Sequence, residues 1–453
     1  MLEGLEISEV MYGDLDSYER IDAELYNKNY THFKTALKRI PFTTFEKESD
    51  IIKKGIFDIK SSCYSTTGIP FVRISNLRNM IIDTSDIVYI PIEEHRKNYK
   101  TELKRGDIIL SKTAIAAASI VNLEKCNVSQ DTVAIKLKSE SKVLSYYVVV
   151  FLNTKYGLEQ LQRRFTGNIQ MHLNLDECKK EVLIPVFPKQ FQEQIQILFE
   201  KSILNSAQSS SLYSEAEDLL LSELDLKDWQ PSSNPFNIKQ LKESFLASGR
   251  LDAEYYQSKY DDLFAQLSKY ECDTIKDIAH IKKSVEPGSE AYRDEGIPFV
   301  RVSDVTKFGI SDPSIFLSPN DFDLQALQPK KDTILLSKDG SVGIAYKVEK
   351  DMDCITSGAL LHLSVFNEDY NPDYLTLVLN SVVVQMQAER DSNGAIIQHW
   401  KPSEIEQVII PKLPKPIQDS ISAKIQESFA LKAESKRLLD EAKMMVEREI
   451  EKG

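Results

Sequence analysis

The sequence predicts an α+β protein made of two homologous domains, each followed by a long helix. One observation is a set of motifs that recurs in the same order after 226 to 230 residues. The other is the end of each copy, where apolar and small residues recur at helical spacing. A repeat of this length indicates a duplicated domain, because solenoid repeats have periods of about 20 to 50 residues. We call residues 1–228 the first copy and residues 229–453 the second copy.

Four pairs of motifs define the repeat. They are Arg20-Ile21-Asp22-Ala23-Glu24 with Arg250-Leu251-Asp252-Ala253-Glu254, Gly68-Ile69-Pro70-Phe71-Val72-Arg73-Ile74-Ser75 with Gly296-Ile297-Pro298-Phe299-Val300-Arg301-Val302-Ser303, Asp107-Ile108-Ile109-Leu110-Ser111-Lys112 with Thr333-Ile334-Leu335-Leu336-Ser337-Lys338, and Ile184-Pro185 with Ile410-Pro411. The second pair reads as a strand entered through a proline, and the third pair reads as a short buried strand followed by a loop. Helical patterns at residues 144–164 and 374–390 add the α component.

The helices that close the copies share one register. The first stripe is Ile195, Phe199, Ser202, Ser206, Ser209, Tyr213, Ala216 and Leu220, and the second is Ile421, Ile425, Ser428, Lys432, Ser435, Leu439, Ala442 and Val446. Alternating spacings of three and four place each stripe on one helix face, as in a coiled-coil seam. A single amphipathic helix usually packs on its own domain. Two matched helices favour packing on each other, and prolines before each helix support separate globular parts.

Composition limits the function classes. The chain has 453 residues, 42% hydrophobic content and a formal charge of -13. We find no apolar run of the roughly 20 residues that span a bilayer, and the five cysteines are scattered without a Cys-x-x-Cys pair. We therefore expect a cytoplasmic protein with reduced cysteines and without a membrane segment. The acidic charge means that any contact with DNA must come from local basic residues.

Known catalytic and metal-binding motifs are absent from the sequence, so we predict no catalytic residue and no metal site. His172 and His399 recur, each a few residues after a glycine. No carboxylate, serine or cysteine recurs beside them, which favours a structural role over that of a catalytic base and leaves a contact with phosphate or a base as an intermediate possibility.

The segment Lys338-Asp339-Gly340-Ser341-Val342-Gly343 follows a predicted strand. Its glycines would let backbone amides approach a phosphate, and a turn with positive φ angles would use glycine equally well. Both interpretations stay open. The first copy has Lys112-Thr113-Ala114-Ile115-Ala116-Ala117 there, without glycine, so the two loops need not share a conformation.

The ordered and repeated motifs resemble the DNA-specificity (S) subunit of Type I restriction-modification systems over almost the whole chain. The resemblance implies a noncatalytic protein in which two target recognition domains each read half of a bipartite DNA sequence. It also implies an antiparallel coiled coil of the two long helices that separates these domains and binds methyltransferase subunits. On this basis residues 1–188 are the first target recognition domain with an N-terminal lead, 189–228 the first spacer helix, 229–414 the second target recognition domain and 415–453 the second spacer helix. The near-repeat gives a pseudo-twofold axis, which suits two identical partners.

The resemblance also implies that strand ends and loops face DNA. The candidates are Arg73, Ser75, Asn76, Lys112, Arg164, Asn168, Gln170 and His172 in the first domain and Arg301, Ser303, Asp304, Lys338, Ser341, Gln398 and His399 in the second. Arg, Asn and Gln can read base edges, whereas Ser and Lys more often contact phosphates. Arg73 and Arg301 recur in domains that should read different sequences, so a phosphate or scaffold role suits them better than base reading.

The expected partners are double-stranded DNA, two methyltransferase subunits and restriction subunits, with S-adenosylmethionine bound by the methyltransferase and no cofactor in this chain. Two alternatives remain: a specificity module for a Type IIG-like methylase-endonuclease, and a protein-binding scaffold without DNA readout. If the distal helix is only a spacer, a chain ending near Pro414 should keep both domains folded and lose its partners.

Overall fold

The computed structural model describes residues 9–12, 15, 23–57, 59–78, 80–84, 86–113, 116–167, 171–234, 236–394 and 397–453. Two compact units are present: unit 1 comprises residues 1–206 and 433–453, and unit 2 comprises residues 207–432. Each unit mixes helices and strands, so the predicted α+β class is confirmed. Among the described residues, no helix is long and apolar enough to cross a membrane.

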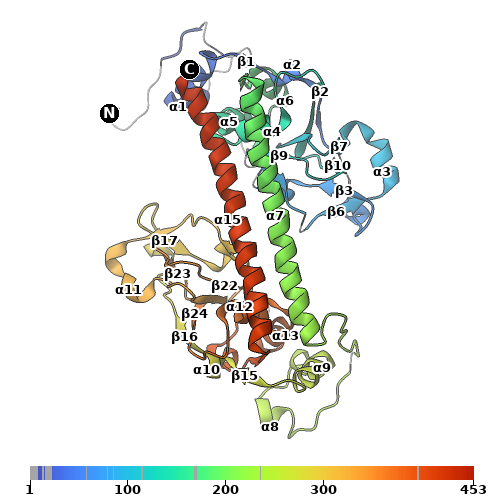
Figure 1. The fold of residues 1–453 in the computed structure, drawn as a ribbon, viewed down its shortest axis with the longest axis vertical. Coiled ribbons are helices and arrows are strands. Elements are labelled where there is room, and N and C mark those ends of the chain that lie inside the picture. The colour runs from blue at the N-terminus through green and yellow to red at the C-terminus, as the bar shows by residue number, and fades with distance from the viewer. Residues whose placement is uncertain are drawn as a thin grey trace. The chain divides into compact units, whose positions relative to one another are not determined.

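Unit 1 contains small antiparallel and mixed sheets with short helices around them (Figure 1). Its helices are α1 (Lys28–Lys38), α2 (Phe45–Glu48), α3 (Ile92–Lys97), α4 (Ser145–Leu152), α5 (Lys155–Gln162), α6 (Leu175–Glu181) and the start of α7 (Lys189–Glu223). Its strands are β1 (Phe42–Thr43), β2 (Ser49–Lys54), β3 (Ile69–Val72), β4 (Leu77–Arg78), β5 (Ile81–Ile82), β6 (Val88–Ile90), β7 (Leu103–Lys104), β8 (Ile108–Ser111), β9 (Ala118–Ile120), β10 (Lys125–Val128), β11 (Thr132–Leu137), β12 (Phe165–Thr166), β13 (His172–Leu173) and β14 (Ile184–Pro185).

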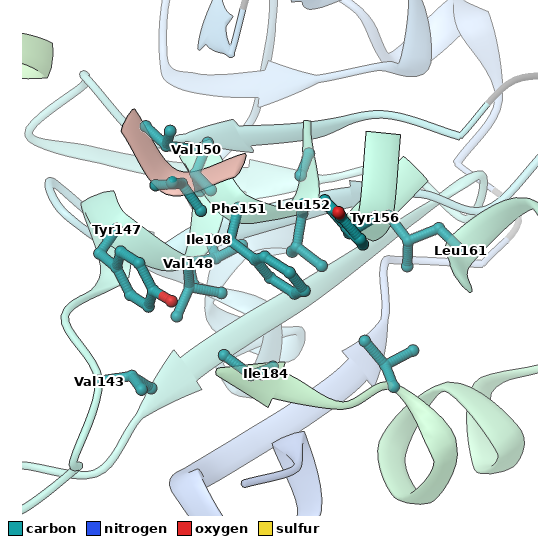
Figure 2. Packing of buried hydrophobic residues seen from close by; sticks show 14 of the residues in the cluster. Ile108, Val143, Tyr147, Val148, Val150, Phe151, Leu152, Tyr156, Leu161 and Ile184 are labelled. Atoms are coloured by element: carbon teal, nitrogen blue, oxygen red, sulfur yellow. The ribbon is translucent and has the colours of Figure 1, made fainter. Parts of the chain in front are cut away.

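The core of unit 1 forms around α4, in which all the residues from Tyr147 to Leu152 are buried. Figure 2 shows Tyr147, Val148 and Phe151 of this helix with Ile108 of β8 and Ile184 of β14. The buried Tyr147 hydroxyl donates a hydrogen bond to the Pro185 carbonyl at 3.0 Å, so its polar atom is satisfied.

Unit 2 has its own set of elements. Its helices are the end of α7, α8 (Phe245–Ser248), α9 (Ser258–Leu267), α10 (Ile275–Ile278), α11 (Leu324–Leu327), α12 (Pro372–Asn380), α13 (Val382–Asp391), α14 (Pro402–Ile405) and the first part of α15 up to Lys432 (whole helix Lys415–Lys452). Its strands are β15 (Cys272–Thr274), β16 (Ala279–Lys283), β17 (Ile297–Val300), β18 (Val305–Thr306), β19 (Gly309–Ile310), β20 (Phe316–Leu317), β21 (Ile334–Ser337), β22 (Ala345–Lys347), β23 (Ile355–Thr356), β24 (Leu360–Val365) and β25 (Ile409–Pro411).

The two units share a strand order. The run β2-β11-β8-β9 in unit 1 has the counterpart β16-β24-β21-β22 in unit 2, and β6-β3-β10 corresponds to β20-β17-β23. The repeated glycine before β3 and β17 has the same reason in both units. A Cβ atom would lie 2.5 Å from the Ile90 carbonyl oxygen at Gly68 and 2.2 Å from the Leu317 carbonyl oxygen at Gly296, and both residues have positive φ. The repeat in sequence is therefore a repeat in fold.

The predicted helix stripes are largely buried, and they pack on a globular core as well as on the other helix. In unit 1, Ser202 and Ser435 are hydrogen-bonded through their hydroxyls at 2.8 Å. In unit 2, the Ser209 and Ser428 hydroxyls lie 3.1 Å apart, and Lys424 pairs with Glu215, which makes the two helices antiparallel there. Small residues therefore let the helices approach, as the pattern predicts.

Two details differ from the predicted stripes. Lys432 is exposed, with its ammonium 4.3 Å from the centre of the Phe308 ring. Moreover, α15 supplies Ile421 and Ile425 to the core of unit 2 and Val446 and Ile450 to the core of unit 1. The expectation that both domains stay folded without this helix is therefore wrong, because each core would lose buried side chains. The predicted domain boundaries at residues 188, 228 and 414 stay a prediction.

Candidate nucleic-acid interface

In unit 1 the end of β8 meets a short hairpin made by β12 and β13. The Lys112 carbonyl accepts a hydrogen bond from the Leu173 amide at 2.8 Å, and Thr113 forms an isolated β-bridge with His172. The hairpin pairs Thr166 with His172. Two predicted site residues, Asn168 and Gln170, lie outside the described residues of this hairpin.

Unit 2 repeats this arrangement at the end of β21. The Lys338 carbonyl accepts a hydrogen bond from the Trp400 amide at 2.8 Å, and Asp339 forms a β-bridge with His399. His399 also forms a β-bridge with Asn393, and we call the described residues here, 393–394 and 397–399, the histidine loop of unit 2. Gly394 has φ +135°, and a Cβ there would lie 1.9 Å from the Ile397 carbonyl oxygen, so only glycine fits. The matching Gly167 has φ +132°.

Side-chain contacts at this place differ between the copies. In unit 2, Asp339 joins two candidates: its Oδ2 forms an ion pair with the Lys338 ammonium, and its Oδ1 lies 2.8 Å from His399 Nδ1. The His399 side chain remains 61% exposed, whereas that of Lys338 is only 11% exposed. In unit 1, the Lys112 ammonium donates to the Gln130 carbonyl at 3.3 Å, and the buried His172 Nδ1 has no hydrogen-bond partner among the described residues. One backbone arrangement thus carries two different polar surfaces.

The glycines of residues 338–343 serve a turn. Gly340 and Gly343 have φ of +75° and +86°, and the Gly340 amide donates to the Gln398 carbonyl at 2.9 Å. This amide is already used within the protein, which favours the turn interpretation over a phosphate cradle at that position. Ser341 and Gln398 are exposed beside the turn.

The candidates after β3 and β17 stabilise turns. Asn76 is fully buried; its Oδ1 accepts from the Arg73 amide at 2.9 Å and its Nδ2 donates to Asp86 at 2.7 Å. Arg73 also donates to the Asp86 carbonyl at 2.6 Å. In unit 2, Asp304 accepts from the Arg301 amide at 2.8 Å. These contacts support the scaffold role considered for the two arginines, while Ser75 and Ser303 are exposed.

Arg164 is the candidate whose position least suits a contact with DNA. Its side chain has no exposed surface. Nη2 donates to the Tyr30 hydroxyl at 2.7 Å, and Nη1 lies 3.7 Å from a Glu177 carboxylate oxygen. Because the guanidinium is enclosed and paired with a buried carboxylate, the structure gives Arg164 an internal role in unit 1 and corrects the assignment of this residue to the DNA surface.

The structure thus brings Lys338, Ser341, Gln398 and His399 together in unit 2 and Lys112 with His172 in unit 1. Sequence reasoning missed Asp339 and Asn393, which hold the loop of unit 2 through side-chain and backbone contacts. The only signal for Asp339 was its place between Lys338 and the glycine turn. Among the described residues, no group of three or more His, Cys, Asp and Glu side chains could hold a metal ion.

Residues 268–443 match the family described as the Type I restriction modification DNA specificity domain. This matched segment is similar to that family, and it contains Lys338, Ser341, Gln398 and His399 and most of α15. The first copy lies outside the matched segment and shares motifs and strand order with the second copy.

Solved structures of similar fold include the S subunit of a Type I restriction-modification system from M. genitalium, at 15% identity, with 90% of this chain and 93% of that chain covered and a TM-score of 0.41. The HsdS subunit from Thermoanaerobacter tengcongensis is 15% identical, with 90% and 95% coverage and a TM-score of 0.28. The type IIG restriction endonuclease BpuSI is 10% identical, with 44% and 35% coverage and a TM-score of 0.30. No curated protein matches the chain.

Proposed function

We propose that this chain is the noncatalytic subunit that reads a bipartite DNA target and recruits methyltransferase and restriction subunits of a restriction-modification system. One observation carries the proposal: in both units, the lysine that follows a buried strand lies beside a loop that contains a histidine. These residues are Lys112 and His172 in unit 1 and Lys338 and His399 in unit 2. A common backbone with different exposed side chains is what two readers of unlike DNA half-sites require.

The two long helices suit a spacer between the readers. A helix of 35 residues such as α7 is about 50 Å long at 1.5 Å per residue. That length is sufficient to connect readers of half-sites separated by about one DNA turn of roughly 34 Å. In this proposal the antiparallel coiled coil also binds two methyltransferase subunits, which carry S-adenosylmethionine, around a pseudo-twofold axis.

Selection from random DNA duplexes tests the proposal. The purified complex is incubated with the duplex pool, and the retained DNA is sequenced. We expect an enriched motif of two short blocks separated by a fixed gap. A single contiguous block, or no enrichment, would contradict reading by two domains.

Lysine variants then test the location of the surface. Lys112→Ala and Lys338→Ala should each weaken binding and make its salt dependence shallower, with the slope reduced by about 0.9 for each phosphate that the protein no longer neutralises. Lys412→Ala is the matched control: Lys412 also carries one positive charge, but it pairs with Glu271 and Asp369 away from the loop. A lysine variant that behaves like Lys412→Ala does not contact DNA.

The formal charge of -13 favours one other function, a scaffold that binds proteins and not DNA. It predicts assembly with partner chains, no enriched DNA motif and no effect of the two lysine variants on salt dependence. The composition of the complex purified with the chain distinguishes separate methyltransferase subunits from a single Type IIG-like methylase-endonuclease.

A further inference from the structure

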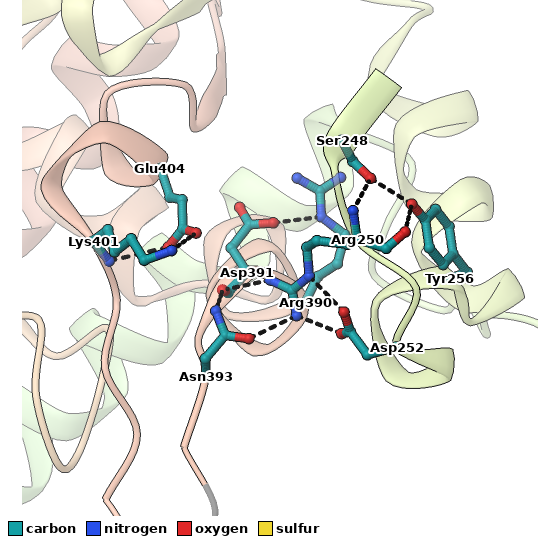
Figure 3. Close-up of polar contacts among 9 residues, drawn as sticks. All are labelled: Ser248, Arg250, Asp252, Tyr256, Arg390, Asp391, Asn393, Lys401 and Glu404. Atoms are coloured by element: carbon teal, nitrogen blue, oxygen red, sulfur yellow. Dashed lines mark hydrogen bonds and ion pairs between the residues drawn. The ribbon is translucent and has the colours of Figure 1, made fainter. Parts of the chain in front are cut away.

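Arg250 lies at the centre of a polar network in unit 2 (Figure 3). It is not one of the candidate residues for contact with DNA. Its guanidinium forms a two-point ion pair with Asp252, with Nε–Oδ1 and Nη2–Oδ2 distances of 2.9 and 2.5 Å. Two further donations leave this pair for the end of α13: Nη1 donates to the Asp391 carbonyl at 3.0 Å, and Nη2 donates to Asn393 Oδ1 at 2.9 Å. One side chain therefore connects the segment before α9 with the start of the histidine loop, 141 to 143 residues away in sequence.

Aromatic packing and burial keep this guanidinium in one orientation. Its Cζ lies 4.4 Å from the centre of the Tyr255 ring, and Arg390 Cζ lies 4.9 Å from the same ring. Only 17% of the Arg250 side chain is exposed. A planar fork that is stacked and paired at two points loses less freedom for each hydrogen bond than a flexible ammonium would.

The contacts continue from Arg250 to the candidate DNA surface. Asn393, which accepts from Arg250, exchanges two backbone hydrogen bonds with His399: the Asn393 amide donates to the His399 carbonyl at 3.0 Å, and the His399 amide donates to the Asn393 carbonyl at 2.7 Å. His399 in turn contacts Asp339, the partner of Lys338. The path thus runs from Arg250 through Asn393 to His399 and Asp339, entirely within unit 2.

We propose that Arg250 is a positioning residue that holds Asn393 and, through it, Gln398 and His399 of the histidine loop in their DNA-reading positions without touching DNA itself. This inference rests on the proposed DNA-reading function. The repeated Arg-x-Asp-Ala-Glu motif is then explained in the second copy by a role in specificity: Asp252 fixes the arginine fork, and the fork fixes the base of the reading loop. Loss of the fork removes the connection between Asn393 and the segment before α9. Asn393 keeps its hydrogen bond to the Asp391 carbonyl and its backbone pair with His399, and His399 keeps its contact with Asp339. With one support fewer, the exposed Gln398 and His399 sample more positions before they meet a base.

The test compares the wild-type complex with Arg250→Ala and Arg250→Lys on two duplexes. One duplex carries the selected target, and the other has only the half-site of the second copy scrambled. We expect Arg250→Ala to lower affinity for the target about tenfold, within the range that one bidentate pairing with a base provides, and to leave affinity for the scrambled duplex unchanged. Arg250→Lys keeps the charge but lacks the fork, so it should resemble Arg250→Ala. Lys412→Ala, which removes a paired positive charge elsewhere in unit 2, should leave the ratio of the two affinities unchanged.

Hydrogen exchange of the free protein gives a second readout that needs no DNA. Peptides containing the Asn393 and His399 amides should exchange at least about tenfold faster in Arg250→Ala, while peptides from β21 and α12 keep wild-type protection.

Each other outcome has a definite meaning. Equal weakening on both duplexes would show that Arg250 contacts phosphate directly, and wild-type discrimination by Arg250→Lys would show that charge alone is sufficient; either result overturns the positioning role. Unchanged exchange in the loop also overturns it. If the wild-type complex does not distinguish the two duplexes, the proposed function itself is contradicted. If both the wild-type and the Arg250→Ala complexes distinguish them equally well, only the positioning role is contradicted.

Discussion

Ending the chain after Lys432 should unfold unit 1, although unit 1 is formed mainly by residues 1–206. The deletion removes residues 433–453, the last part of α15, whose inner face packs on the core of the first copy. Leu439, Val446 and Ile450 are 8%, 0% and 1% exposed there. Their partners in the core include Ile195 and Phe199 of α7, which would become exposed to water.

The magnitude follows from burial. Each of these three aliphatic side chains contributes roughly 1.5 to 3 kcal/mol when fully buried, so their loss costs about 5 to 9 kcal/mol. A whole domain is stable by only roughly 5 to 15 kcal/mol. Unit 1 is thus brought to the edge of unfolding, whereas unit 2 keeps Ile421 and Ile425 of the same helix.

Hydrogen exchange followed by mass spectrometry checks this result. Peptides from β8 and α4 should lose protection in the truncated chain, while peptides from β21 and α12 retain it. Wild-type protection of β8 and α4 would refute the reasoning.

Point variants repeat the test without a deletion. Ile450→Ala should cost about 2 to 5 kcal/mol in the free energy of unfolding of unit 1. Met444→Ala, on the same helix but 48% exposed, is the matched control and should change it by less than about 0.5 kcal/mol. Equal effects of the two variants would contradict the packing described for α15.

Three further predictions concern side chains inside the fold. Burial lowers the pKa of His362 from 6.5 to about 4. Between these pH values the unfolded state binds more protons than the folded state, so the stability of unit 2 should fall by up to about 3 kcal/mol as the pH falls. Unfolding curves at pH 7 and 4.5 should lose this pH dependence in His362→Ala, a substitution chosen because Ala134 occupies the matching strand position in unit 1. Asp373→Ala should destabilise unit 2 by about 3 kcal/mol, because the buried Lys347 loses its one buried partner, at 2.8 Å, and keeps only the more exposed Glu349 and Asp332 at 3.4 and 3.6 Å. Thermal unfolding should show a much smaller change for the exposed Asp351→Ala. Ser202→Leu should lower the free energy of unfolding by about 1 to 3 kcal/mol, since Ser202 is 2% exposed and lies next to Ser435. Chemical denaturation of Ser210→Leu, at an exposed position, should show whether a larger side chain has that effect without burial.

The local parts of the fold could be predicted because short-range patterns encode them. The short apolar run entered through a proline in Gly-Ile-Pro-Phe-Val-Arg predicts the strands β3 and β17, and the glycine before each is required by a close carbonyl oxygen. The three-four spacing of the closing stripes predicts α7 and α15 and the buried serines between them. The lysine and histidine of each copy could be selected for the same reason, since they recur at fixed distances from these elements.

By itself, then, the sequence determined the duplication, the α+β class, the two long helices and the candidate loops, because each depends on residues close together in the chain. Only the tertiary structure decided that Arg164 lies inside a core, that Asp339 and Asn393 connect Lys338 to the histidine loop, and that Arg250 donates a hydrogen bond to Asn393 from 143 residues away. It also decided that α15 contributes to the cores of both units. The physical reason is that a charged side chain has the same local pattern whether it pairs internally or faces solvent, and only the packing of distant segments brings its partner within hydrogen-bonding distance.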